Sequence, residues 1–424
     1  MILATALLLV LALLGTPLFV IIAAGALLGF HQSGVDLSVV AIEFYRLAEM
    51  PVMIAIPLFT FAGYLLSESR APTRLVRLSN ALLGWMPGGL ALVSLVACAL
   101  FTAFTGASGV TIVALGALLY PALKEAGYRQ TFSLGLITTS GSLGLLFAPS
   151  LPLILYGVVV QQMTLERPVS IDELFLAGIL PGVLMVAMLG LYSMMQPLRP
   201  ETSAARQHPR IRDALRESIW EIPLPIIVLG GIYSGYFAVS EAAAVTALYV
   251  LVVVVGINRE VSMRKLPLIM RESMITVGGI LIVLGASLAS TNYLIDAGIP
   301  DAILTAIRTH IDSKWTFLIL LNGFLLLLGM MLDIFSALVL IVPILLPIAL
   351  GYDIHPVHLG IVFLANMQLG YFTPPIGMNL FIASYRFKKP VMELYRASLP
   401  FFFILLVAVL IITYWPALSL VLIE

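Results

Sequence analysis

Long apolar stretches separated by short polar segments run through the whole chain. Stretches that can cross a bilayer core of about 30 Å as helices, or nearly so, are 1–30, 51–69, 175–196, 222–237, 239–257, 273–295 and 401–422. The first of them is too long for the core of a signal peptide, so we expect it to be retained as a helix. Segments 31–50, 70–85 and 299–315 are more amphipathic, which is typical of helices that lie along a membrane surface. The pattern predicts an all-α polytopic membrane protein.

Two further apolar runs in the first half are interrupted by Gly, Ser, Thr and Pro. Residues 88–104 and 110–123 flank the sequence Thr105-Gly106-Ala107-Ser108-Gly109, and each run is too short to cross alone. We therefore predict a re-entrant helical hairpin over 88–124. The next span, 129–161, is interrupted at 140–152 and predicts a broken transmembrane helix. Because a bilayer favours continuous helices, breaks at this depth usually line a binding site for a solute or an ion.

The same pattern recurs in the second half of the chain. A second hairpin is predicted over 316–350 with its interruption at 331–335, and a second broken helix over 356–386 with its interruption at 369–377. One sequence offset separates Pro121 from Pro347, Gly144 from Gly370, and Pro149 from Pro375. We therefore predict two repeats, 1–221 and 239–424, joined by a linking helix over 222–238.

The distribution of basic residues predicts the orientation. If both hairpins enter and leave on one face, all of the 22 Lys and Arg residues except Arg46, Arg167, Arg308 and Lys314 fall in loops on the same side. That side is then cytoplasmic, because cytoplasmic loops carry the excess of positive charge. The N-terminus is expected in the cytoplasm and the C-terminus in the periplasm. The first hairpin enters from the cytoplasm and the second from outside, so the two repeats are inverted.

The composition agrees with a membrane protein and excludes several functions. The chain is 61% hydrophobic and 10% charged, with a mean hydropathy of +1.09. Five His and one Cys make no metal or disulfide framework, and no nucleotide-binding loop occurs. Paired acids or an activated nucleophile are not visible, so we expect neither an enzyme nor a bound organic cofactor. No nucleic-acid partner is expected.

The interruptions carry oxygen atoms that suit a small hard cation. Carbonyls freed from a helix and hydroxyls of Ser and Thr are hard ligands, so one Na⁺ site per repeat is the natural hypothesis. The first site would comprise Thr105, Gly106, Ala107, Ser108, Gly141, Gly144 and Pro149. The second would comprise Asp333, Ser336, Gly370, Thr373, Pro374 and Gly377. A carboxylate substrate between them would be held by helix N-termini and by Ser108, Ser142, Ser150, Asn366, Pro375 and Asn379.

Two carboxylates have a second interpretation. Asp333 is an intramembrane acid and hence a candidate for ion coupling, and the alternative is a structural cap on the hairpin tip. Glu241 lies at a helix start, where a carboxylate offsets the helix dipole, and we favour a capping role for it.

Several motifs together resemble the large membrane subunit, the DctM type, of the tripartite ATP-independent periplasmic (TRAP) transporters. They are Gly106-Ala107-Ser108-Gly109-Val110-Thr111, Gly141-Ser142-Leu143-Gly144, and Asn366-Met367-Gln368-Leu369-Gly370 followed by Thr373-Pro374-Pro375-Ile376-Gly377-Met378-Asn379. Two positions depart from the family pattern: Ala107 replaces one of two serines, and Ala148 replaces the first of two prolines. A hydroxyl ligand is therefore lost at Ala107, although its carbonyl remains.

The resemblance implies partners and a mechanism. The expected partners are a small four-helix membrane subunit of the DctQ type and a periplasmic solute-binding protein of the DctP type. The complex would import an organic acid across the bacterial inner membrane with a Na⁺ gradient, by an elevator movement of the hairpins and broken helices. An alternative is a self-sufficient ion-coupled transporter of organic or inorganic anions with the same architecture.

Overall fold

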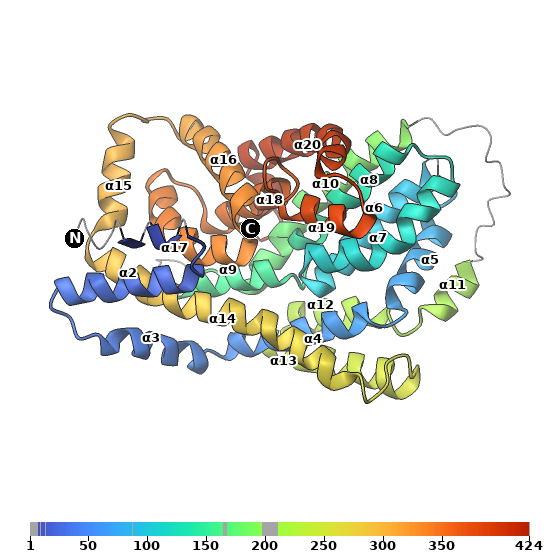
Figure 1. Cartoon of the computed structure of the whole chain (residues 1–424), viewed down its shortest axis with the longest axis horizontal. Coiled ribbons are helices and arrows are strands. Elements are labelled where there is room, and N and C mark those ends of the chain that lie inside the picture. The colour runs from blue at the N-terminus through green and yellow to red at the C-terminus, as the bar shows by residue number, and fades with distance from the viewer. Residues whose placement is uncertain are drawn as a thin grey trace.

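The computed structural model describes residues 7–8, 10–12, 14–86, 88–163, 168–196 and 211–423, and these form helices and connecting turns without a strand (Figure 1). The start of the first predicted span, Arg167 and the loop from Arg199 to Arg210 lie outside the described residues. The prediction of an all-α membrane protein is confirmed. Within the described residues, six helices are long and apolar enough to cross a membrane, and two bent pairs add to them.

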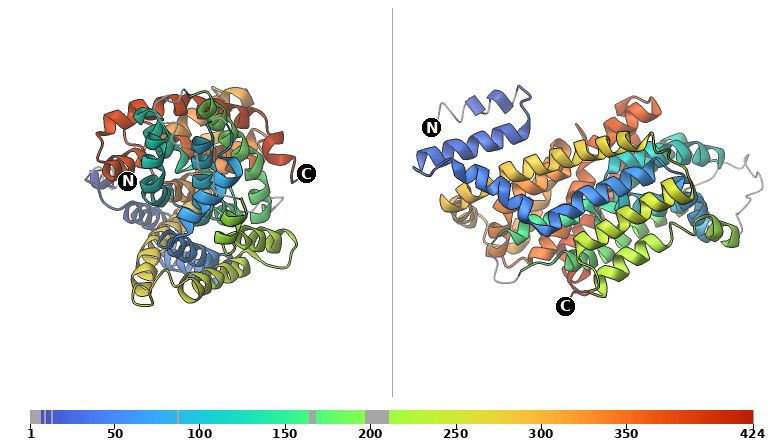
Figure 2. Two further views of the ribbon diagram at one scale, coloured as in Figure 1. Left: turned by 90° about the vertical axis from the view of Figure 1, so that its right-hand side faces the viewer. Right: turned by 90° about the horizontal axis from the view of Figure 1, so that it is seen from below.

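One layer of the molecule is formed by helices that pack side by side along the lower part of Figure 1. It contains α2 (Leu18–Gln32), α3 (Ser38–Glu49), α4 (Ala55–Ser67), α12 (Pro223–Tyr233), α13 (Val239–Leu251) and α14 (Leu266–Asp296). Figure 2 shows α4, α13 and α14 next to one another when the molecule is viewed from below. The predicted linking helix ends early, at Tyr233, because Gly235 turns the chain with a positive φ of 73°. We call this layer the scaffold.

The second layer contains both predicted hairpins. Hairpin 1 consists of α6 (Gly89–Thr105) and α7 (Ser108–Glu125), and hairpin 2 consists of α16 (Lys314–Met331) and α17 (Ile334–Gly351). Gly106 ends α6 in the left-handed conformation, with φ of 64°, which glycine adopts without a steric cost. At the tip of hairpin 2 the chain turns through Leu332 and Asp333.

The same layer contains both broken helices. Helix α8 (Gln130–Ser140) ends before break 1, which we define as residues 141–150, and α9 (Leu151–Gln161) follows it. A short 3-10 turn, Leu143–Leu146, lies within the break, and the chain bends by 41° between Gln130–Leu146 and α9. Helix α18 (Pro356–Gly370) ends before break 2, residues 371–377, and α19 (Met378–Phe387) follows. Both breaks contain a cis peptide bond, at Ala148–Pro149 and Pro374–Pro375.

The hairpins and broken helices pack across the two halves of the chain. Helix α17 of hairpin 2 lies against α9, and α7 of hairpin 1 lies against α19. Helices α10 (Ile171–Met194) and α20 (Val391–Tyr414) cover them, with α10 against α18 and α20 against α8. We call this unit the hairpin block. It meets the scaffold through α4 and α14, which contact α6 and α17 respectively.

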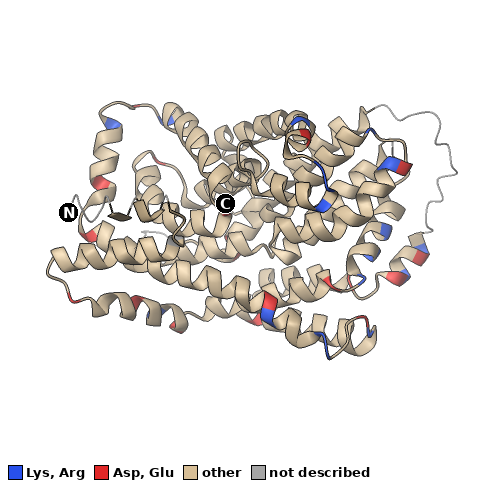
Figure 3. Cartoon of the chain, viewed as in Figure 1, with Lys and Arg blue, Asp and Glu red and all other residues tan. Residues whose placement is uncertain are grey.

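Many charged residues lie toward the two ends of the molecule, and others lie between them on the lower helices and beside α20 (Figure 3). The helices α5 (Ala71–Leu83) and α11 (Ile211–Glu217) and the turn between α13 and α14 lie toward one end, while α15 (Ile299–Arg308) lies at the opposite end (Figure 1). The apolar helices α6, α7 and α16 to α18 run between them. Helices of this length and apolar composition agree with a bilayer around the middle of the molecule.

A buried ion-pair cluster joins α5 to the scaffold. Arg74 donates from Nε to Glu221 Oε1 at 2.8 Å and also pairs with Glu260, while the Arg70 backbone N–H donates to Glu260 Oε2 at 2.9 Å. Burial raises the pKa of the Glu221 carboxyl despite its Arg74 partner. Burial also acts to raise the pKa of Glu260, but the hydrogen bonds from Arg74 and Arg70 outweigh it and hold that pKa below its usual value. The Arg74 side chain is only 13% exposed, so it faces protein rather than lipid headgroups.

Candidate functional site

The tip of hairpin 1 lies inside break 1. A Cβ atom added to Gly106 would lie 2.6 Å from Leu151 Cδ1, and one added to Gly141 would lie 3.2 Å from the Ser108 carbonyl oxygen. Thr105, Gly106 and Ser108 are all buried. The structure therefore brings together the tip and the break that were predicted to share the first cation site.

Thr102 is a polar partner of this site that the sequence interpretation missed. Its Oγ1 lies 2.9 Å from the Gly141 carbonyl oxygen and 2.7 Å from the Thr111 Oγ1. The hydroxyl also lies 2.7 Å from the Cys98 carbonyl oxygen of its own helix. The signal that could have found it is a threonine one helical turn before the predicted tip, on the side facing the break.

The two halves use glycine in the same way to bring a broken helix against a hairpin. A Cβ atom at Gly144 would lie 2.2 Å from the Ala99 carbonyl oxygen and 2.4 Å from the Ala103 nitrogen, both in α6. A Cβ atom at Gly370 would lie 2.5 Å from the Gly329 Cα in α16. Because these neighbours are backbone atoms, they cannot rotate away, and only glycine fits at either position.

The tip of hairpin 2 is closed onto break 2 by hydrogen bonds. The Ile334 N–H donates to the Tyr371 hydroxyl at 2.8 Å, and the Gly377 N–H donates to the Met330 carbonyl at 3.2 Å. Tyr371 was not among the predicted site residues. The second predicted tip and break are thus also adjacent.

Asp333 caps the N-terminus of α17. Its Oδ1 accepts from the N–H groups of Phe335 and Ser336, each at 3.0 Å. Together with Ser336 it lines a cavity of about 310 Å³ that opens between this tip and Thr276, Gly279, Ile280 and Val283 of α14. The capping interpretation therefore describes one role of Asp333, and the cavity leaves room for a second.

Break 1 meets the last turn of α18, directly before break 2, at the centre of the hairpin block. The Gln368 amide donates from Nε2 to the Ser142 carbonyl oxygen at 2.5 Å, and the Ser142 hydroxyl donates to the Gln368 carbonyl at 3.5 Å. These residues are 226 positions apart, the same offset that separates Gly144 from Gly370. Two segments related by a two-fold axis contact each other through equivalent residues at that axis. The pair therefore agrees with the predicted repeat.

Buried oxygen atoms without a hydrogen-bond partner are concentrated at these elements. Hairpin 1 and break 1 contribute Oγ1 of Thr105 and Oγ of Ser108 and Ser150, and the helices around break 2 contribute the amide oxygens of Asn366, Gln368 and Asn379. Leaving such an acceptor unsatisfied in a protein interior costs about 1–3 kcal/mol. All but Gln368 belong to the predicted cation or substrate sets, and all of them suit a cation or a hydrogen-bond donor.

A polar network fixes which atom of Asn366 is left free. Asn322 donates from Nδ2 to the Leu318 carbonyl at 2.9 Å, which turns its Oδ1 toward Asn366. Asn366 then donates from Nδ2 to Asn322 Oδ1 at 2.6 Å and to the Val362 carbonyl at 2.9 Å. Because the Val362 carbonyl can only accept, the Asn366 amide cannot be reversed. Its Oδ1 is therefore the unpartnered acceptor.

Some of the predicted residues are used elsewhere. The Thr373 hydroxyl donates to the Leu369 carbonyl at 2.7 Å, and the Pro375 carbonyl accepts from the Tyr395 hydroxyl of α20. Pro374 and Pro375 are exposed. Glu241 accepts from the Ala238 N–H at 2.9 Å, which is the capping arrangement favoured from the sequence.

Two helical hairpins packed against two broken helices, with unpartnered oxygens between them, are the architecture of a membrane transporter. The fold is similar to that of the YdaH transporter of Alcanivorax borkumensis. The TM-score is 0.64 at 14% sequence identity, over 90% of this chain and 87% of that one. This likeness concerns the fold alone.

The family is shown by sequence. The model of the tripartite ATP-independent periplasmic transporter, DctM component, matches residues 5–418, and the chain belongs to this family. It is 33% identical to the C4-dicarboxylate TRAP transporter large permease protein DctM of Rhodobacter capsulatus, over 93% of this chain and 91% of that protein. It is 31% identical to the ectoine/5-hydroxyectoine TRAP transporter large permease protein UehC of Ruegeria pomeroyi, over 97% of this chain and 96% of that protein. The isethionate permease DctMQ of Oleidesulfovibrio alaskensis is 33% identical over 89% of this chain and 59% of that protein. The chain is thus a transporter subunit and not an enzyme.

Proposed function

We propose that this chain is the large membrane subunit of a Na⁺-coupled importer for a small organic acid. The observation that carries the proposal is the set of buried, unpartnered oxygens on hairpin 1, break 1 and the helices around break 2. A cation without a strong preference for nitrogen or sulfur ligands satisfies such oxygens, and Na⁺ is one. The carbonyls of Gly141 and Ser142 lie at the same elements, although each already accepts a hydrogen bond.

The proposed substrate is a carboxylate that lies between the two breaks. The names of the relatives include C4-dicarboxylate, isethionate and ectoine. Neither the two tips nor the two breaks contain Lys or Arg. A carboxylate would therefore rely on the N–H groups at the starts of α7, α9 and α19, on the Ser150 hydroxyl and on the bound cations.

The proposed partners are a small four-helix membrane subunit of the DctQ type and a periplasmic solute-binding protein of the DctP type. Membership of a tripartite family supports both. The proposed location is a bacterial inner membrane with the N-terminus in the cytoplasm. The grouping of α5, α11 and the α13–α14 turn at one end of the molecule supports this orientation, because the sequence assigned all of them to the basic side. Cysteines introduced at Arg70 and Lys124 should both be labelled from the cytoplasm, and labelling from opposite sides contradicts the topology.

The proposed transport step is an elevator movement of the hairpin block against the scaffold. The cross-packing of α17 on α9 and of α7 on α19 supports movement of both hairpins as one unit. In the structure described above, Asp333 and Phe335 of hairpin 2 face Gly279 of α14 across the cavity between them. A bifunctional thiol reagent with a cleavable disulfide spacer, joining cysteines at positions 335 and 279 across the cavity, should stop uptake, and reduction of the spacer should restore it. Undiminished uptake by the cross-linked protein would exclude the movement.

The cation proposal is tested by thermal stability in Na⁺. A ligand that binds only the folded protein raises its stability with concentration, so Na⁺ at constant ionic strength should protect the purified protein from heating. Ser108→Ala should require about tenfold more Na⁺ for the same protection, since one oxygen ligand to a charged group contributes roughly 1.5 kcal/mol. The matched control is Ser398→Ala, because Ser398 Oγ is also buried and unpartnered but lies in α20, outside the tips and breaks. Equal effects of the two variants, or protection by K⁺ as good as by Na⁺, would refute the proposal.

A further inference from the structure

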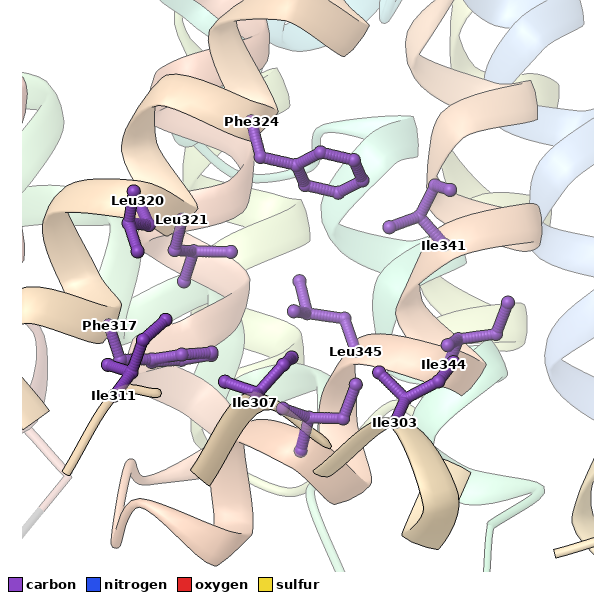
Figure 4. Close-up of a pocket in the computed structure, with 11 residues that line it drawn as sticks. Ile303, Ile307, Ile311, Phe317, Leu320, Leu321, Phe324, Ile341, Ile344 and Leu345 are labelled. Atoms are coloured by element: carbon purple, nitrogen blue, oxygen red, sulfur yellow. The ribbon is translucent and has the colours of Figure 1, made fainter. Parts of the chain in front are cut away.

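The two hairpins differ in how their helices meet. Between α16 and α17 of hairpin 2 lies a cavity of about 360 Å³, and α15 closes one end of it (Figure 4). Side chains from both hairpin helices point into the space, and among them are Phe317, Leu321 and Phe324 from α16 and Ile341 and Leu345 from α17. Ile303 and Ile307 reach it from α15. Hairpin 2 is therefore incompletely filled by its own side chains.

The chemistry of the cavity selects a hydrocarbon. Every residue that lines it is aliphatic or phenylalanine, so no polar group is present to orient a polar ligand. Its volume lies within the range of roughly 300–1,000 Å³ that is usual for small-molecule sites. On α15, Ile303 and Ile307 lie one helical turn apart and face the cavity, and Ile311 from the following turn extends this apolar surface. A flexible acyl chain fits a cavity with this apolar lining.

Two cations lie beyond the end of the cavity that α15 closes. Phe317 of the lining stacks on Tyr352 with ring centroids 4.4 Å apart, and the Arg308 guanidinium lies 5.5 Å from the centre of the Tyr352 ring. Arg308 donates to the Gly351 carbonyl, and Lys314 Nζ donates to the Asp353 carbonyl at 2.5 Å. Neither cation forms an ion pair with any carboxylate among the described residues. Their charges are thus available to a phosphate.

Aromatic residues indicate the depth of this end in the membrane. Trp315 follows Lys314 and stacks on Tyr414 with ring centroids 5.3 Å apart, and its side chain is largely exposed. Trp and Tyr are enriched where a bilayer meets water, at the level of the headgroups. The cations therefore lie at headgroup level, and the cavity extends from there into the hydrocarbon region.

We propose that a phospholipid is bound at hairpin 2, with one acyl chain between α16 and α17 and its phosphate at Arg308 and Lys314. The lipid completes the packing of the hairpin and connects it to α15. The apolar lining accounts for the acyl chain, and the two cations, which have no carboxylate partner in the described part of the chain, account for the headgroup.

The test measures phospholipid that stays with the protein after purification in a mild detergent, by phosphorus content and mass spectrometry. The wild type should retain phospholipid. Ile344→Trp fills the cavity and should lose it, whereas Leu327→Trp, on an exposed position of α16 that does not line the cavity, should keep it. The double variant Arg308→Gln and Lys314→Gln should bind roughly tenfold more weakly, because a charge-assisted hydrogen bond contributes about that factor. Arg46→Gln, which removes another cation predicted on the same side, should have no effect.

The fluorescence of Trp315 provides a second measurement, which does not depend on the cavity-filling variant Ile344→Trp. With Trp85, Trp220 and Trp415 replaced by Phe, its fluorescence should be quenched by a brominated phospholipid at a lower fraction in mixed micelles than by brominated detergent. The double variant should need roughly tenfold more brominated phospholipid for the same quenching. Equal quenching by both compounds, or equal lipid retention by Ile344→Trp and Leu327→Trp, overturns the proposal.

Discussion

Gly144→Ala tests the contact between break 1 and hairpin 1. The added methyl group would lie 2.2 Å from the Ala99 carbonyl oxygen and 2.4 Å from the Ala103 nitrogen, whereas real contacts of this kind need more than 3 Å. Gly144 has no positive φ, so alanine is compatible with its backbone conformation. Any loss of stability in Gly144→Ala therefore comes from the displacement of α6 from break 1.

The magnitude follows from the nature of the neighbours. Overpacking a well-filled core usually costs about 1–3 kcal/mol, and the lower values apply where side chains can rotate away. Here both neighbours are helix backbone, so we expect a loss of at least 2 kcal/mol, or roughly thirtyfold in the ratio of folded to unfolded protein. Gly323→Ala in α16 is the matched control, since no heavy atom comes within 4 Å of its added Cβ. It should be neutral or stabilising by up to about 1 kcal/mol, because alanine favours a helix.

The assay compares the fraction of monodisperse protein that survives heating, followed by uptake at a temperature where the variant is folded. Gly144→Ala should lose the monodisperse state at a lower temperature than the wild type and Gly323→Ala, and should transport poorly. If Gly144→Ala is as stable and active as Gly323→Ala, α6 does not lie against break 1 as described.

Three other substitutions probe contacts outside this pair. Arg74→Gln should lower the temperature at which the protein survives heating much more than Arg77→Gln, because Arg74 neutralises two partly buried carboxylates and Arg77 forms one exposed pair. If both substitutions lower that temperature by a similar amount, the ion-pair cluster contributes little to stability. Thr102→Val removes the hydroxyl next to the Gly141 carbonyl and should raise the Na⁺ concentration for half-maximal uptake. Thr246→Val, which only breaks a bond within α13, should leave that concentration unchanged. Tyr371→Phe removes the acceptor for the first N–H of α17 and should cost about 1 kcal/mol of thermal stability, and an unchanged melting curve would contradict that bond.

Local chemistry made the hairpins and breaks predictable from sequence. Glycine at 106 permits the left-handed turn that ends α6, and Asp333 supplies the cap that starts α17, so both tips have a cause within a few residues. The contacts that join the halves have no such local cause. The bond between Ser142 and Gln368 joins break 1 to α18, two segments 226 residues apart in sequence, and hydrophobic periodicity does not predict which distant segments meet.

Two further features, the orientation of Arg74 and the cavity in hairpin 2, could not be predicted from the sequence for a related reason. The amphipathic pattern predicted α5, but it does not distinguish an arginine that faces headgroups from one that faces protein, and Arg74 does the latter. Helices α16 and α17 are apolar nearly all round, so their sequences carry no preferred face and give no sign of the cavity between them.

Uptake by the reconstituted complex tests the central claim most directly. Proteoliposomes would contain this chain with its small subunit, and labelled organic acid would be supplied with or without the periplasmic binding protein, under an inward gradient of Na⁺ or of K⁺. We predict accumulation only when the Na⁺ gradient and the binding protein are both present, and its loss when the Na⁺ gradient is collapsed. Accumulation that persists without Na⁺ would contradict ion coupling, and accumulation without the binding protein would instead identify a self-sufficient transporter.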